Sequence, residues 1–262
     1  MLFFIGQVLP YIAAAVFLVG TCLRVAGWLR VPVPFPLTLF PAASTNAGRV
    51  LAISREILFF DSLRRGEKWL WLWSWLMHIA LVMVIVGHIA GIYYLAKQFT
   101  LVGFSAEASA SLSAWLGTIF GAVFFVSLLA LFYRRMTIPE VKRLSDPADY
   151  FDLGLLLAIV VTGMYMRLVS GADLPAVRAY IAGLFTLHPV PIPQDWLFIS
   201  HFTLVNILLL YFPFSKLIHL AGIFVNQAMI TQPPPVYPPR RVNPTPAGSS
   251  RSVSFGEGGR RL

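Results

Sequence analysis

The chain has 262 residues, of which 58% are hydrophobic and only 12% are charged, and its mean hydropathy is +0.75. A soluble protein carries about 25% charged residues, so this composition excludes a soluble domain and favours a bundle of transmembrane helices. The single cysteine, Cys22, excludes an intrachain disulfide, C-x-x-C-H haem attachment and a four-cysteine iron–sulfur cluster held by this chain alone. The net charge of +9 lies mainly between apolar segments and in the tail, which is typical of membrane topology signals and not of a nucleic-acid-binding face.

Five apolar segments are long enough to cross a bilayer as helices, which takes about 20 residues. The first holds no charge before Arg24 and lacks the basic start of a signal peptide, so we expect it to be retained as a span. The prediction is an all-α integral membrane bundle of five transmembrane helices, residues 1–231, followed by a Pro-, Gly- and Arg-rich cytoplasmic tail, residues 232–262, which awaits a partner to order it. The predicted spans run approximately from Leu2 to Trp28, Trp69 to Leu95, Ser113 to Tyr133, Tyr150 to Val169, and Trp196 to Val225.

The basic residues of the connections predict the orientation. The first and third connections and the tail are rich in Arg and Lys, whereas the opposite side carries only Lys97, Arg167 and Arg178. Cytoplasmic loops hold the excess of positive charge, so we expect the N-terminus outside and the C-terminus inside the cytoplasmic (inner) membrane of a bacterium or archaeon. Apolar and charged residues recur at helical spacing from Ala47 to Arg65, which predicts a helix lying on the cytoplasmic membrane surface.

Four of the five histidines lie within the predicted spans, where an ionisable side chain is costly and usually functional. His78 and His88 are ten residues apart on the second span, and His201 and His219 are eighteen residues apart on the fifth. Because these helices are antiparallel, they offer two nested pairs, an outer one (His88, His201) and an inner one (His78, His219). Each pair could clamp a haem iron from both sides. The axial separations, about 15 Å and 27 Å, differ, and tilt or a kink at Pro213 has to absorb part of that difference.

A second class of protein stays open, a haem-free membrane anchor or transporter that uses the histidines for packing or for proton movement. One intramembrane histidine can simply bond to a neighbouring helix, but four in two nested pairs favour haem. His188 lies in the HPVPIP connection and is expected to be an ordinary interfacial loop residue.

The two histidine-bearing segments closely resemble the ligand helices of the respiratory nitrate reductase gamma subunit family, whose members are five-span cytochromes with two b haems. The resemblance rests on MHIALVMVIVGHIAGI, residues 77–92, and LFISHFTLVNILLLYFPFSKLIHL, residues 197–220. It covers both histidine spacings and nearly the whole membrane part, and it fails in the tail. Cytochrome subunits of formate dehydrogenases and hydrogenases are the near alternative, but they place their histidines differently.

This resemblance implies two haem b groups, the outer ligated by His88 and His201 and the inner by His78 and His219. It also implies a quinone (menaquinone or ubiquinone) beside the outer haem near Gly87, and electron exchange with an iron–sulfur protein on the cytoplasmic face. The lysine that the family carries at its quinone site is absent here, since the corresponding stretch, SAEASA, has no basic residue.

Three cations near the cytoplasmic side are further candidates for cofactor binding. Lys216 lies one helical turn before His219, and Arg134 and Arg135 resemble the family's basic pair after the third span. Each could pair with the anionic propionates of the inner haem, although positive-inside signalling explains the two arginines equally well. Gly163, on the fourth span, is expected mainly to let helices pack closely.

Within this superfamily, the Pro-rich tail and the HPVPIP loop resemble the membrane cytochrome of the sulfite-reductase-associated transmembrane complex. The partner in that complex resembles the iron–sulfur subunit of heterodisulfide reductase. We favour this sulfur-metabolism branch over a nitrate reductase gamma subunit proper. The predicted function is that of a quinone-linked oxidoreductase subunit, in which this chain transfers electrons and partner subunits convert the substrate. Further membrane subunits remain open as partners.

Overall fold

The computed structural model describes residues 1–31, 43 and 45–230, so the predicted tail lies outside the described residues. Helices and short turns make up this part of the chain, and no strand occurs in it. Five helical segments are long and apolar enough to cross a membrane, which confirms the predicted all-α membrane bundle. They are Phe4–Arg30, Lys68–Tyr94, Ala106–Thr137, Pro147–Ser170 and Trp196–Phe214.

Each span consists of one long α-helix, in two cases joined to a π-helical turn. The long helices are α1 (Leu9–Arg30, preceded by the turn Phe4–Val8), α4 (Lys68–Tyr94), α5 (Ala106–Thr137), α7 (Pro147–Tyr165, followed by the turn Met166–Ser170) and α9 (Trp196–Tyr211). Shorter helices connect or extend them: α2 (Asn46–Phe59), α3 (Asp61–Gly66), α6 (Pro139–Arg143), α8 (Leu174–Phe185) and α10 (His219–Ile230), with 3-10 turns at Gln98–Val102, Phe212–Phe214 and Lys216–Ile218.

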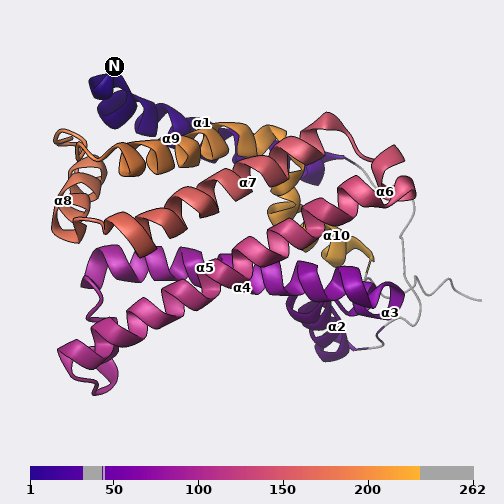
Figure 1. The fold of residues 1–262 in the computed structure, drawn as a ribbon. Helices are drawn as coiled ribbons and strands as arrows, with labels where there is room; N and C mark the ends of the chain where they lie inside the picture. The colour runs from indigo at the N-terminus through magenta and orange to yellow at the C-terminus, as the bar shows by residue number, and fades with distance from the viewer. Residues whose placement is uncertain (32–42, 44, 231–262) are drawn as a thin grey trace, which may run out of the picture.

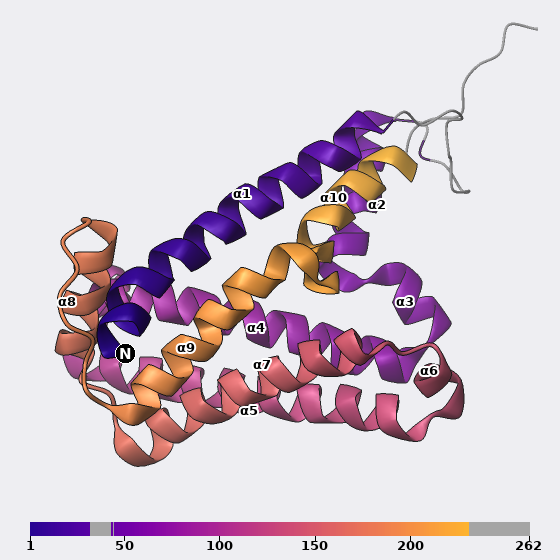
Figure 2. The same cartoon turned by 90° about the horizontal axis from the view of Figure 1, so that it is seen from above.

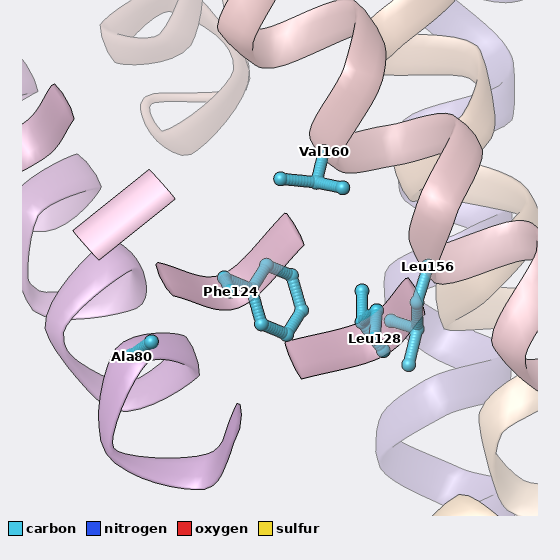
Figure 3. Close-up of a cluster of buried hydrophobic side chains, with 5 residues drawn as sticks. All are labelled: Ala80, Phe124, Leu128, Leu156 and Val160. Carbon is cyan, nitrogen blue, oxygen red and sulfur yellow. The ribbon is translucent and has the colours of Figure 1, made fainter. Parts of the chain in front are cut away.

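The spans pack in series, α4 against α5, α5 against α7, α7 against α9, and α9 against α1 (Figures 1 and 2). A buried apolar cluster joins the first three of these helices, formed by Ala80 of α4, Phe124 and Leu128 of α5, and Leu156 and Val160 of α7 (Figure 3). Because lipid tails are as apolar as these side chains, the cluster stabilises the bundle through close packing and not through removal from water.

The fifth span differs from the expected continuous helix. Pro213 cannot donate a backbone hydrogen bond, and α9 gives way there to the two 3-10 turns. Ser215 between the turns is extended, and its Oγ accepts a bond from Leu217 N at 3.1 Å, which starts a new helical run. His201 and His219 therefore do not lie on one continuous helix, since α10 turns away from the axis of α9 (Figure 1).

The predicted surface segment is helical, as expected, but it is divided into α2 and α3 at Phe60, whose φ is +50°. Its position on a membrane surface stays a prediction. Helix α8, within the connection after the fourth span, was not expected. Its Tyr180 is buried and donates to the carbonyl of Gly6 at 2.5 Å, so α8 closes the end of the bundle where the chain begins (Figure 1).

Candidate haem-binding site

The four histidines of the predicted spans lie in two groups, in the pairs that the sequence suggests. His78 of α4 faces His219, the first residue of α10, with 3.5 Å between their Nε2 atoms and 79° between their rings. His88 of α4 and His201 of α9 have nearly parallel rings, 8° apart, with centroids separated by 6.2 Å. The break after α9 makes this arrangement attainable, because the axial distance from His201 to His219 is no longer that of one straight helix.

One nitrogen of each imidazole is occupied by the protein itself. In all four rings Nδ1 lies within hydrogen-bonding distance of a backbone carbonyl, which accepts from an N–H at Nδ1 and leaves Nε2 available as a ligand atom. This is the state in which histidine binds a metal, and the carbonyl fixes both tautomer and ring orientation. The contacts are His78 with Ser74 at 2.7 Å, His88 with Val84 at 2.7 Å, His201 with Ile159 at 3.1 Å, and His219 with Lys216 at 2.9 Å.

The spacing within each pair suits one metal atom. A metal–imidazole bond is about 2 Å long, so two nitrogens on opposite sides of one metal lie about 4 Å apart. The Nε2 atoms of His78 and His219, at 3.5 Å, are slightly closer than that. The centroid separation of 6.2 Å in the outer pair also leaves room for one metal between the rings. The residues therefore fit a haem, which needs only two protein ligands because the macrocycle supplies four nitrogens.

Helix α7 supports the outer pair through two residues that sequence reasoning did not assign to it. Thr162 Oγ1 lies 3.0 Å from His201 Nδ1. A Cβ on Gly163 would lie 3.1 Å from His201 Cε1. Gly163 does serve helix packing, as expected, but the group that needs the space is the imidazole of His201.

The surroundings of His88 and His219 are open. Both side chains are exposed, and no heavy atom of the described residues lies within 4 Å of the position that a Cβ on Gly87 would take. A flat macrocycle or a quinone ring could therefore approach His88 without displacing protein atoms. Gly87 as a cofactor contact stays a prediction.

The three candidate cations all have carboxylate partners. Arg134 Nη2 lies 2.7 Å from Glu67 Oε2, which ties α5 to the start of α4. Arg135 Nη1 lies 3.0 Å from Asp149, and Lys216 Nζ lies 2.8 Å from the same carboxylate. These ion pairs hold the ends of the helices together. A role in binding propionates stays a prediction for each cation, which would have to share its charge with a carboxylate.

A cavity of about 610 Å³ adjoins His219. Its wall includes the cations Arg24 of α1 and Lys216, together with the polar side chains of Asn226 and Tyr211. Such a wall suits an anionic group, for example a propionate, next to the inner histidine pair. The sequence did not indicate a binding role for Arg24, which is simply the first charged residue of the first span. No group of three or more His, Cys, Asp or Glu side chains within the described part of the chain is arranged to hold a bare metal ion.

The sequence profile of the nitrate reductase gamma subunit family matches residues 63–239, more than half of the chain. The chain belongs to this family. It is a multi-pass membrane protein, and the family is the one that its two histidine-bearing segments resemble. The match begins at residue 63 and so does not include α1 or α2.

Three relatives support this assignment. The "Hdr-like menaquinol oxidoreductase cytochrome b-like subunit" of Archaeoglobus fulgidus is 32% identical, over 84% of this chain and 77% of that protein. The protein of the same name from Archaeoglobus profundus is 27% identical, over 85% of this chain and 77% of the relative. The "Respiratory nitrate reductase 1 gamma chain" of Escherichia coli is 25% identical, over 85% of this chain and 92% of the relative.

Proposed function

We propose that this chain is the membrane cytochrome b subunit of a respiratory complex, and that it relays electrons through two haem b groups held by His88 with His201 and by His78 with His219. The inner pair carries this proposal. Its Nε2 atoms face each other at 3.5 Å while both Nδ1 atoms are engaged by carbonyls. With both Nδ1 atoms protonated, two neutral imidazoles would point lone pairs at one another, an arrangement that a metal between the two Nε2 atoms would relieve.

When bound, haem b supplies reversible one-electron exchange. The described residues supply what surrounds that chemistry. The Nε2 atoms of His78, His88, His201 and His219 would hold the haems, and the carbonyl bonds at Nδ1 keep each ring in one orientation and would raise the basicity of the ligand nitrogen. His78 and His201 are partly buried between apolar spans, which limits the access of water to these two ligands.

The names of the relatives favour a quinone as the membrane reactant. Two of them are called menaquinol oxidoreductase subunits, so menaquinone is preferred to ubiquinone here. We place the quinone beside the outer haem, near Gly87, where the surface next to His88 is open. The chain is then the electron-transfer subunit of a quinone-linked oxidoreductase.

The electron partner is an iron–sulfur subunit on the cytoplasmic face, and a subunit resembling heterodisulfide reductase is favoured by the "Hdr-like" names of the archaeal relatives. The end of the bundle formed by α2, α3 and α6 carries the basic connections, which fits a cytoplasmic location for that end and an external N-terminus. A role in sulfur metabolism is part of this proposal, and other membrane subunits can complete the complex.

The first test is haem quantification on the full chain purified in detergent after expression with ample haem. A pyridine haemochrome assay is expected to give two b haems per chain. His88→Ala and His219→Ala should each remove about one haem, whereas His188→Ala should remove none, because His188 belongs to neither pair and its Nδ1 contacts the carbonyl of Thr186 in a loop. A chain without haem, or equal losses of haem in all three variants, would contradict the proposal and favour the haem-free anchor or transporter.

The quinone site is tested separately, by following haem reduction after addition of a menaquinol analogue. Gly87→Leu would fill the open space beside His88 and is expected to slow reduction at least tenfold while both haems stay bound. Gly27→Leu on α1, where a Cβ also meets no atom within 4 Å, is the matched control and should behave like the unaltered chain. Equal rates in all three chains would place the quinone elsewhere.

A further inference from the structure

Phe60 occupies the single position between α2 and α3. Its backbone lies in the left-handed region, with φ +50° and ψ +50°. A bulky residue other than glycine adopts this region at a cost, and it persists only where the surroundings hold it there.

Two indole groups of α4 fix the chain just before Phe60. Trp75 Nε1 donates to the carbonyl of Leu58 at 2.9 Å, and Trp71 Nε1 donates to the carbonyl of Phe59 at 2.8 Å. These are two of the carbonyls left without a partner at the end of α2. Trp71 and Trp75 thus join the end of α2 to the helix that carries His78.

A buried carboxylate fixes the chain just after Phe60. Asp61 is 6% exposed and forms ion pairs with three arginines, Arg55, Arg64 and Arg65. Hydrogen bonds from Arg65 and then Arg64 lower the pKa of Asp61 to about 2. The carboxylate is therefore ionised under ordinary conditions, and it holds the first turn of α3 in place.

The turn directs the ring of Phe60 onto His78. The two ring centroids lie 5.0 Å apart with an interplanar angle of 90°, an edge-to-face contact. His78 is thereby held by three neighbours: the carbonyl of Ser74 at Nδ1, the facing imidazole of His219 at Nε2, and the ring of Phe60. The carbonyl of Ser74 and the ring of Phe60 restrict the rotation of the imidazole, whereas His219 faces its Nε2.

We propose that Phe60 is a positioning residue that sets the plane of the His78 imidazole, so that the surface segment α2–α3 controls the inner haem from outside the membrane bundle. This rests on the proposed function of the histidines as haem ligands. A haem held by His78 and His219 would sense the orientation of its ligand rings, and EPR and a redox titration would report a change in that orientation. The inner pair is nearly perpendicular at 79° and the outer nearly parallel at 8°, so the outer haem serves as an internal reference.

The test uses the full chain in detergent with both haems bound. Phe60→Gly removes the ring and keeps the turn, because glycine adopts positive φ without strain. Phe60→Asn, which also tolerates this region, is the second ringless variant should the glycine chain express poorly. Phe60→Tyr keeps the ring. Phe59→Leu is the matched control, since Phe59 is the adjacent ring but is 52% exposed.

The readouts are haem content, EPR of the oxidised chain and a redox titration that resolves both haems. The ringless variants are expected to shift the inner signal and the inner midpoint potential, or to lose the inner haem, while the outer haem is unchanged. Phe60→Tyr and Phe59→Leu should match the unaltered chain. An unchanged inner haem without the ring, or an equal shift in Phe59→Leu, would overturn the positioning role alone. Absence of haem from the unaltered chain would overturn the proposed function together with it.

Discussion

The hydroxyl oxygen of Thr162 lies 3.0 Å from Nδ1 of His201, so that α7 orients a side chain carried by α9. The same Thr162 hydroxyl can donate to the carbonyl of Ala158 or Ile159, both at 2.9 Å. The Thr162 oxygen can then accept from the N–H at His201 Nδ1. The carbonyl of Ile159, 3.1 Å from the same nitrogen, is a second acceptor for this N–H. The outer pair therefore depends on the packing of α7 against α9.

Replacement of Thr162 by valine keeps the volume and removes one acceptor from the His201 ring. Loss of such an orienting partner weakens metal binding about 10- to 100-fold, and we expect the outer haem to dissociate at least tenfold faster while the inner haem is retained. Haem release into an excess of apomyoglobin measures this. Thr203→Val is the control, because Thr203 Oγ1 donates to the carbonyl of Ile199 on α9 itself. Equal release from both variants would contradict the role of Thr162.

Gly163→Val should remove the outer haem by steric displacement. A Cβ at this position already lies 3.1 Å from His201 Cε1, and the two methyl groups of valine would push the imidazole out of line. The expected haem content falls from two to one per chain. Gly154→Val on the same helix should keep both haems, since a Cβ there meets no atom within 4 Å. Retention of both haems in Gly163→Val would show that the ring moves freely.

The break in the fifth span should be sensitive to α1. A Cβ on Gly20 would lie 2.8 Å from Cβ and 2.9 Å from Cγ of Pro213, and a proline ring cannot turn aside. Gly20→Val is expected to destabilise the chain by about 1–3 kcal/mol, as overpacking does, and to lower the Tm in detergent. Gly27→Val, in open space on the same helix, should leave the Tm within the error of the measurement.

The charge of Asp61 predicts a pH dependence of stability. Its pKa is lowered from the ordinary 3.8 to about 2, chiefly by Arg65 and Arg64, so folding favours the ionised form. This contribution is complete above about pH 4 and is lost as the pH falls toward about 2. Thermal unfolding of the unaltered chain and of Asp61→Asn should therefore differ by a constant amount from pH 7 down to about 4 and converge below that. A difference that persists at pH 2 would contradict the ionic origin.

The sequence was sufficient to pair the histidines, because depth in the membrane and the high cost of an ionisable group there depend only on position along each span. It was not sufficient to identify Thr162 and Gly163 as neighbours of His201. That contact depends on the rotation of α7 about its axis, and a span that is apolar all round shows no preferred face.

Two backbone features were also beyond the sequence. Pro213 predicted a kink, but the new helical start at Ser215 depends on a local side-chain bond that many serines near a proline do not form. The left-handed turn at Phe60 has no glycine or asparagine to signal it. Its cause is non-local, since it lies in the tryptophans of α4 and in the arginines around Asp61.

The interruption of the fifth span makes the two ends of the molecule unequal as targets of natural variation. In a continuous helix, one residue inserted between the two histidines would turn the second by about 100° relative to the first and shift every helical residue after it. Here His201 and His219 belong to separate helices joined by residues 212–218. A change of length or sequence in that joint reorients His219 and leaves His201 in place. The geometry of the inner histidine pair can thus change through this joint alone, while the outer pair keeps its arrangement.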